Sequence, residues 1–422
     1  MSKKSEKQIL VYADWAELGG PTFMGTLNAT VVRGKEIFAF EYDETWLKKY
    51  NTLYLDPNLG MYKGRQFLPE AKRNFGIFLD SSPDRWGQVL MKRREALIAR
   101  EEGRKEIPFF ESDFLLGVFD KHRMGALRFK LNDTEAFLND NKAFATPPWT
   151  ALRDLEYASM RLEEDEGKDG AEDLKWINML IAPGSSLGGA RPKASVVDEK
   201  GHLWIAKFPS NNDDRDIGAW EMVVHTLAAK AGVMVPDASS QIFYGKYNTF
   251  LSRRFDRTSK GSRIHFASAM TLLDHNDGDD HTAGASYLEM VEFIQKFGGN
   301  VTNDLEQLWR RIVFNICVSN TDDHLRNHGF LLTEQGWILS PAYDMNPVAK
   351  GSGLTLNISE TDNSLNLEVA REVAEYFRLG KDKAGIIITE VVSSVKHWKE
   401  IATHLGISNS QVQNMKDAFS HY

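Results

Sequence analysis

The densest group of reactive side chains in the sequence is the stretch 320–327, NTDDHLRN, which follows a long apolar helical pattern. Asp322 and Asn327 stand five residues apart. This is the spacing of a kinase catalytic loop, in which the aspartate takes a hydroxyl proton and the asparagine holds a magnesium ion. An Asx turn at a helix end explains each residue separately, but it does not explain their order along the chain.

The residues that follow this stretch predict a β-hairpin. Two apolar runs, 329–333 and 337–340, are separated by Glu334-Gln335-Gly336, a short polar segment with the glycine that a tight turn needs. Such a hairpin returns the chain and brings Asp344 beside Asn327. Because Mg²⁺ prefers oxygen ligands and water, Asp344 is predicted to be the second magnesium ligand.

A lysine in an apolar strand is a further candidate. The segment 194–207 predicts a hairpin with a glycine turn, and Lys207 ends its second strand. A lysine in such a strand is expected to have an anionic partner, which Glu221 on the helix predicted at 216–230 can provide. Kinases use this pairing to hold ATP phosphates, although an ordinary lysine on an amphipathic edge strand fits the pattern equally well.

A glycine-rich stretch, 183–193, directly precedes this hairpin. Glycines allow backbone N–H groups to approach phosphate oxygens closely. The stretch is not a Walker A loop, because no Gly-Lys-Ser/Thr opens a helix. A glycine-rich turn without any ligand is the alternative.

The acidic segment 274–281, DHNDGDDH, resembles a calcium loop but lacks its pattern. Counted from Asp274, the glycine is fifth instead of sixth, and position twelve is Ala285, which excludes an EF-hand. Its histidines lack the helix-face spacing of a metal hydrolase. We expect a solvated surface loop or a loop on the substrate side of the site.

Composition limits the classes of protein to which the chain can belong. A chain of 422 residues with 42% hydrophobic and 26% charged residues predicts a globular protein of two or three domains. The net charge of −8 argues against binding nucleic acid or anionic membrane by bulk electrostatics. The single Cys317 excludes an internal disulfide, and neither a signal peptide nor a membrane span is recognisable, so we expect a cytoplasmic protein.

The candidate residues need several elements to position them. Short strands are predicted within 8–42, and Ser82-Pro83-Asp84 predicts the start of a helix, with the proline at its first position, that ends near Gly103. After Thr258 the pattern is mostly helical. We predict three parts: an N-terminal subdomain (1–146), a β-rich lobe with the glycine-rich loop (147–257) and a helical lobe (258–422).

Taken together, these motifs resemble the HipA family of bacterial toxin kinases. The resemblance rests on 186–193 (SLGGARPK), 205–207 (IAK), 254–257 (RFDR), 321–327 (TDDHLRN) and 343–344 (YD), in this order. The segments SSPDRWGQVL and 123–129 (RMGALRF) are similar to the family's N-terminal subdomain, so the resemblance covers nearly the whole chain.

The resemblance implies an α+β fold of the protein-kinase-like, bilobal type, with an extra N-terminal α/β subdomain, a β-rich ATP-binding lobe and an all-helical C-terminal lobe. It implies a Ser/Thr kinase that uses ATP and Mg²⁺ and is the toxin of a type II toxin–antitoxin pair. The implied partners are a DNA-binding helix-turn-helix antitoxin, through which alone the chain would meet DNA, and an aminoacyl-tRNA synthetase as substrate. No membrane partner is implied.

The resemblance also assigns roles to residues. Asp322 would be the catalytic aspartate, Asn327 and Asp344 the magnesium ligands, and Lys207 the ATP lysine supported by Glu221. Ser186 would be the autophosphorylation site, with Ser185 as the alternative. The other residues expected at ATP are Leu187, Gly188, Gly189, Ala190, Arg191, Lys193, Ser252, Arg253, Arg254, Phe255 and His324, together with Ser186 itself.

Two other functions remain compatible with these residues. A small-molecule or lipid kinase could use the same aspartates and asparagine for another hydroxyl acceptor. A non-catalytic pseudokinase could serve as a co-repressor that binds an antitoxin, although pseudokinases usually lack at least one of the four residues Lys207, Asp322, Asn327 and Asp344. Magnesium-dependent nucleotide binding discriminates between the catalytic and the non-catalytic function.

Overall fold

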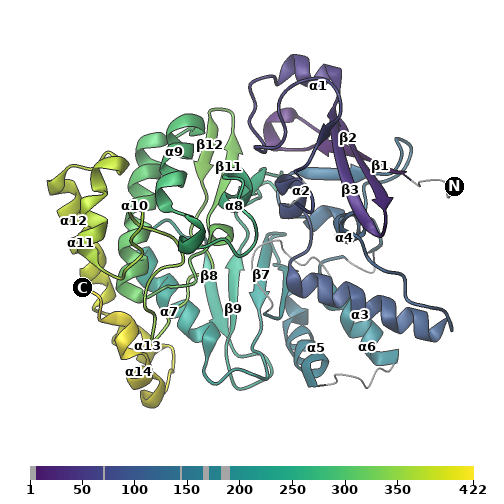
Figure 1. The fold of residues 1–422 in the computed structure, drawn as a ribbon. Coiled ribbons are helices and arrows are strands. Elements are labelled where there is room, and N and C mark those ends of the chain that lie inside the picture. The colour runs from purple at the N-terminus through teal and green to yellow at the C-terminus, as the bar shows by residue number, and fades with distance from the viewer. Residues whose placement is uncertain (1–5, 70–71, 143–144, 165–170, 182–190) are drawn as a thin grey trace. The chain divides into compact units, whose positions relative to one another are not determined.

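The computed structural model describes residues 6–69, 72–142, 145–164, 171–181 and 191–422. The chain forms two compact units, one of residues 1–206 and 256–267, the other of residues 207–255 and 268–422. Both units contain helices and strands (Figure 1). No helix within the described residues is both long enough and apolar enough to cross a membrane.

The first unit contains a five-stranded antiparallel sheet. Its strand order is β4-β3-β2-β1-β5. The turn between β2 and β3 consists of Arg33 and Gly34, which both have positive φ angles of 51° and 79°. Two such residues match the twist of the flanking strands. The strands are β1 (Glu6–Ala13), β2 (Thr22–Val32), β3 (Lys35–Tyr42), β4 (Gln66–Phe67) and β5 (Leu127–Lys130).

Within the residues that the structure describes, six α-helices accompany this sheet. The longest, α3, is capped by Asp84, whose carboxylate accepts a hydrogen bond from the Gly87 N–H at 2.8 Å. The predicted start was therefore wrong: Pro83 precedes the cap, and the helix begins at Arg85. The helices are α1 (Glu44–Lys49), α2 (Gly76–Asp80), α3 (Arg85–Glu101), α4 (Glu111–Gly117), α5 (Leu152–Glu164) and α6 (Ala171–Ile181).

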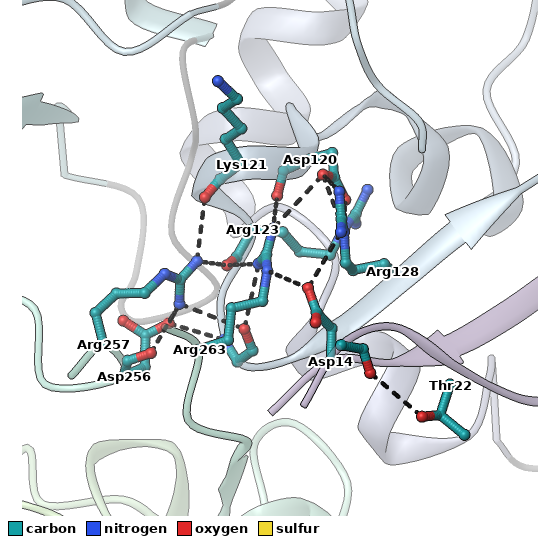
Figure 2. A network of polar contacts seen from close by, with 11 residues as sticks. Asp14, Thr22, Asp120, Lys121, Arg123, Arg128, Asp256, Arg257 and Arg263 are labelled. Carbon is teal, nitrogen blue, oxygen red and sulfur yellow. Dashed lines mark hydrogen bonds and ion pairs between the residues drawn. The ribbon is translucent and has the colours of Figure 1, made fainter. Parts of the chain in front are cut away.

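A cluster of buried arginines joins the segment 256–267 to the loop 120–126 (Figure 2). The Asp256 carboxylate accepts hydrogen bonds from the Gly125 N–H at 2.8 Å and from Arg257 at 2.6 Å. Arg257 and Arg263 also donate to the main-chain carbonyl of Arg123. The 254–257 motif therefore places its last two residues in the core of the first unit.

Arg123 itself donates to four main-chain carbonyls. Its two terminal nitrogens bind the carbonyl oxygens of Ser81, Leu115, Val118 and Leu138 at 2.7–3.0 Å. The side chain is fully buried, and this burial lowers its pKa to about 10, so it remains charged at neutral pH. It closes the loop around residue 120 onto the helices α2 and α4.

The glycine-turn hairpin predicted at 194–207 is present. It consists of β6 (Lys193–Val197) and β7 (Leu203–Lys207). Gly201, with a φ of 81°, donates its N–H to the Asp198 carbonyl at 3.0 Å. The Asp198 carboxylate accepts from Trp204 and His202, which fixes the turn. Lys207, at the end of β7, is the first residue of the second unit.

The second unit is built around α10, which packs against α9, α11 and α12 (Figure 1). Its helices are α7 (Ile217–Lys230), α8 (Ala269–Leu272), α9 (Tyr287–Phe297), α10 (Val301–Val318), α11 (Leu367–Glu372), α12 (Lys381–Val395), α13 (Trp398–His404) and α14 (Asn409–Met415). Its hairpins are β8 (Ala238–Gln241) with β9 (Thr249–Arg253) and β11 (Gly329–Thr333) with β12 (Gly336–Leu339). The short strand β10 (Phe266–Ser268) lies where the chain returns to this unit.

Candidate active site

The predicted catalytic loop directly follows the buried helix α10. Ser319 ends the helix with a φ of 50°, and the Asn320 N–H bonds the Asn315 carbonyl at 2.9 Å. Beyond this turn the Asp322 side chain is 76% exposed, so an acceptor hydroxyl can reach it. Asn327, in contrast, is buried at 5% exposure.

Asn327 has the arrangement expected of a metal ligand. Its amide nitrogen donates to the Asp322 main-chain carbonyl at 2.7 Å, which orients the amide group. Its buried oxygen has no hydrogen-bond partner within the described part of the chain. A buried carbonyl oxygen without a donor is costly, and a hard cation with oxygen ligands would satisfy it.

The hairpin β11–β12 returns the chain to this loop, as the sequence predicted. Phe330 pairs with Leu339 and Thr333 with Gly336, so two residues form the turn. After the hairpin the Tyr343 hydroxyl donates to the Arg326 carbonyl at 2.8 Å. Tyr343 and Asn327 line the same small cavity, which places the next residue, Asp344, at the loop.

Asp344 has a backbone conformation that is unusual for a residue other than glycine. Its φ of 57° lies in the left-handed region, which aspartate tolerates better than most side chains. Such outliers concentrate at functional sites, where the surrounding structure stabilises them. Together with Asn327, Asp344 could supply two oxygen ligands to Mg²⁺, whose remaining ligands are usually phosphate and water.

Lys207 binds two carboxylates in the second unit. Its ammonium donates to Glu221 at 2.6 Å and to Asp344 at 2.5 Å. Burial by itself favours the neutral amine, but the two carboxylates raise the pKa of Lys207 above its usual value. The lysine is therefore a fixed cation, and α7 supplies the buried carboxylate of Glu221 that holds it.

The electrostatics around Asp322 come from several neighbours. Partial desolvation raises the pKa of Asp322, His324 lowers it, and Asp344 raises it further. His324 Nε2 lies 3.9 Å from Asp322 Oδ1. Burial and the adjacent Arg326 charge lower the pKa of His324.

Asp323 is a part of the loop to which sequence reasoning gave no role. It is buried, and it accepts hydrogen bonds from the Tyr287 hydroxyl and, at 2.7 Å, from the Thr355 N–H. Burial raises its pKa to about 7. Asn315 in α10 donates to the same hydroxyl at 3.0 Å. The hint in the sequence is Asn315 within the otherwise apolar run 312–318 at the end of α10, followed by an Asp-Asp pair.

The segment 252–255, which the resemblance placed at ATP, reaches the same part of the second unit. Phe255 lies beside Tyr343, with ring centroids 5.5 Å apart. Arg254 is buried, and Arg253 donates to the Asp237 carboxylate at 3.1 Å. The second unit thus contains Lys207, Glu221, Ser252, Arg253, Arg254, Phe255, Asp322, His324, Asn327 and Asp344.

By residue number, the glycine-rich loop falls within the range of the first unit. Ser185, Ser186, Leu187, Gly188, Gly189 and Ala190 lie outside the described residues. Arg191 is half-buried. Lys193 is buried, and its ammonium binds the Asp84 carboxylate at 2.8 Å. The structure thus gives Lys193 a carboxylate partner at the cap of α3, where the sequence predicted a phosphate contact.

Comparisons with known proteins relate the chain to a family of kinases. The family model "HipA-like C-terminal domain" matches residues 185–415, more than half of the chain. A protein from Haemophilus influenzae named "Putative kinase" is 26% identical over 179 residues, 38% of this chain and 52% of that protein. "Putative kinase Y4dM" from Sinorhizobium fredii is 26% identical over 285 residues, 54% of this chain and 68% of that protein. The chain therefore spans about half the length of the Haemophilus protein.

A solved structure resembles the chain over nearly its full length. HipA of Shewanella oneidensis, in a complex with HipB and operator DNA, superposes with a TM-score of 0.63 and covers 98% of this chain and 95% of its own, at 16% identity. This likeness confirms the predicted α+β, kinase-like fold. Because the family model matches more than half of its residues, the chain belongs to the family of the HipA-like C-terminal domain.

Proposed function

We propose that the chain is an ATP-dependent serine/threonine protein kinase of the HipA type. The observation that carries this proposal is the double contact of Lys207 with Glu221 and Asp344, in the unit that also holds the Asp322–Asn327 loop. A buried lysine fixed by a helix carboxylate and by a candidate metal ligand is what phosphate binding requires of this fold.

Each of the four residues Lys207, Asp322, Asn327 and Asp344 would have its own role in phosphoryl transfer. Asp322 is exposed, so it can accept the proton of an incoming hydroxyl. Asn327 and Asp344 would hold Mg²⁺. Lys207 would bind a phosphate oxygen, while Glu221 would keep its ammonium in place. When bound, ATP would supply the phosphoryl group, and Mg²⁺ would neutralise part of the negative charge that develops during its transfer.

A kinase of this type needs an acceptor for the phosphate and has a role in the cell. We take the acceptor to be a serine or threonine of a translation protein, an aminoacyl-tRNA synthetase, so that the free chain acts as a toxin in the cytoplasm. A helix-turn-helix antitoxin would restrain it and make the DNA contacts that a net charge of −8 disfavours. The Shewanella HipA was solved with HipB and operator DNA, which supports such a partner.

We further propose that the kinase inactivates itself by phosphorylation of Ser186, with Ser185 as the alternative. A phosphoserine carries about −1.5 to −2 charges at pH 7. Beside the ATP phosphates this charge would repel the nucleotide. Peptide mapping of the purified protein identifies the modified serine, and a fully phosphorylated form that binds ATP normally would refute the mechanism.

The decisive experiment is quantitative phosphopeptide mass spectrometry of cells that express the parent chain or Asp322→Ala. Protein phosphopeptides that appear only with the parent support the proposal and name the substrate. Equal phosphopeptides in both, with Mg-ATP binding and ATP hydrolysis retained, indicate a small-molecule or lipid acceptor. Absence of Mg-dependent nucleotide binding indicates a pseudokinase.

A further inference from the structure

Arg326 lies between Asp322 and Asn327 in the loop, and within the described part of the chain its side chain contacts Asp277 and His324. Nη1 lies 3.0 Å from Oδ1 of Asp277, and Nη2 lies 3.4 Å from Nε2 of His324. The same His324 nitrogen is 3.9 Å from the Asp322 carboxylate. A continuous line of polar groups therefore runs from Asp277 through Arg326 and His324 to the proposed base.

The segment that carries Asp277 is itself fixed to α9. His275 contacts Asp279 at 3.1 Å through Nδ1 and Glu289, in the first turn of α9, at 3.0 Å through Nε2. The Asn276 N–H also donates to Asp279 at 2.8 Å. These contacts therefore fix the segment that carries Asp277, which limits the positions that the Asp277 side chain can reach.

A second contact joins the helix α9 to the catalytic loop. Tyr287, at its first position, donates its hydroxyl to Asp323. Asp323 adjoins the proposed base, and Arg326 lies four residues beyond that base. The loop is thus tied to α9 on both sides of His324, while within the described residues the Asp322 carboxylate itself accepts no hydrogen bond.

We propose that Arg326, held by Asp277, is a positioning residue that acts on Asp322 through His324. This inference rests on the proposed kinase function. Arg326 does not touch the reactants in this role. It fixes the imidazole edge beside the Asp322 carboxylate, which limits the directions from which that carboxylate can accept the proton of a hydroxyl.

An ordinary surface ion pair is the competing explanation. Arg326 and Asp277 side chains are 30% and 32% exposed, and an ion pair of this kind adds little to stability. It would leave turnover unchanged. The contact of the second guanidinium nitrogen, Nη2, with His324 distinguishes the two explanations, because an ordinary ion pair with Asp277 does not need it. The fork of the guanidinium presents two nitrogens in a fixed geometry, which the point charge of a lysine does not reproduce.

The test compares Arg326→Ala, Arg326→Lys, Asp277→Asn and the double variant Asp277→Asn/Arg326→Ala. Arg371→Ala is the matched control, because it removes an exposed arginine that pairs with Glu368 elsewhere in the same unit. The readout is the transfer of phosphate from radiolabelled Mg-ATP to a degenerate serine/threonine peptide library, as kcat and KM for ATP, together with the Tm.

We expect Arg326→Ala to lower kcat roughly tenfold, a part of the 10²- to 10⁴-fold that a positioned base contributes. The KM for ATP and the Tm should change no more than in Arg371→Ala. Arg326→Lys should recover only part of kcat. Asp277→Asn should lower kcat less than Arg326→Ala does. The double variant should have the kcat of Arg326→Ala, because both substitutions interrupt the same line of contacts to Asp322.

Three results would overturn the inference: kcat of Arg326→Ala within twofold of the parent, an effect on KM alone, or losses that multiply in the double variant. Failure of the proposed function is a separate result. In that case the parent transfers no phosphate to the library, or Asp322→Ala transfers it as fast as the parent.

Discussion

Replacing Lys207 by methionine perturbs the candidate site at its centre. Methionine keeps much of the length of the side chain but leaves Glu221 and Asp344 without the cation that contacts both of them. The Glu221 side chain is only 4% exposed, and that of Asp344 is 24% exposed. Water can therefore replace the lysine at Asp344 but hardly at Glu221.

The expected loss of stability follows from this burial. Removing one partner of a buried ion pair costs about 3–5 kcal/mol, and the lower end applies because Glu221 can take up a proton. About 3 kcal/mol corresponds to a Tm decrease of roughly 6–12 °C in a unit of this size. The affinity for Mg-ATP should fall roughly 10- to 150-fold, since one charge-assisted contact contributes about 1.5–3 kcal/mol.

Differential scanning fluorimetry and titration with a fluorescent ATP analogue, with and without Mg²⁺, measure the two effects. Lys383→Met is the control, because Lys383 is a half-exposed lysine that pairs with Glu306 in the same unit. Such an exposed pair contributes at most about 1 kcal/mol. If Lys207→Met unfolds at the same temperature as Lys383→Met and binds Mg-ATP like the parent, the reasoning is wrong.

The pH dependence of the same variant provides an internal check. Without the lysine, burial raises the pKa of Glu221, so the folded variant binds more protons than its unfolded chain. Its stability is then lost as the pH rises through the raised pKa. The Tm difference between the parent and Lys207→Met should therefore be smaller at pH 5 than at pH 8. A difference that grows at low pH would contradict the burial argument.

Three further outcomes are expected. His275→Gln should destabilise the protein at pH 6 but not at pH 9 in urea unfolding, because contacts with Glu289 and Asp279 raise the pKa of His275 and their stabilisation is lost as the pH rises through it. Asp256→Asn should cost about 3 kcal/mol in the first unit without changing ATP affinity, since it leaves the buried Arg257 charge without its carboxylate; an unchanged urea midpoint would count against this. Asp322→Ala should abolish phosphate transfer and keep Mg-ATP binding, as isothermal calorimetry against the parent will show.

The loop and hairpin of the candidate site could be predicted because their signals are local. The spacing of Asp322 and Asn327 and the glycine turn at Gly336 each lie within a few residues. The order of these signals was enough to predict that Asp344 returns to the loop, and the contact of Tyr343 with Arg326 confirms this return. Lys207 and Glu221 are also close in sequence, on a strand and the helix that follows it.

What the sequence did not reveal depends on contacts between distant segments. Tyr287 is 36 residues from Asp323, and the 3.0 Å ion pair between Asp277 and Arg326 joins residues even farther apart. Neither pair has a periodicity or a turn signature. Lys193 illustrates the same limit of prediction from sequence. A lysine in a glycine-rich loop suits a phosphate, yet in the structure its ammonium binds the Asp84 carboxylate, 109 residues away in the sequence.

The arginines in Figure 2 have a consequence for how the protein can change during evolution. Arg123 donates to four main-chain carbonyls, and Arg257 and Arg263 bind carbonyls of the same loop. Every residue has a carbonyl, so substitutions among the residues that accept these bonds leave the bonds possible. The guanidinium has no such substitute, because no other side chain offers five N–H donors in one plane. Saturation mutagenesis should therefore find arginine essential at position 123, and Leu115, Val118 and Leu138 replaceable by side chains of similar shape.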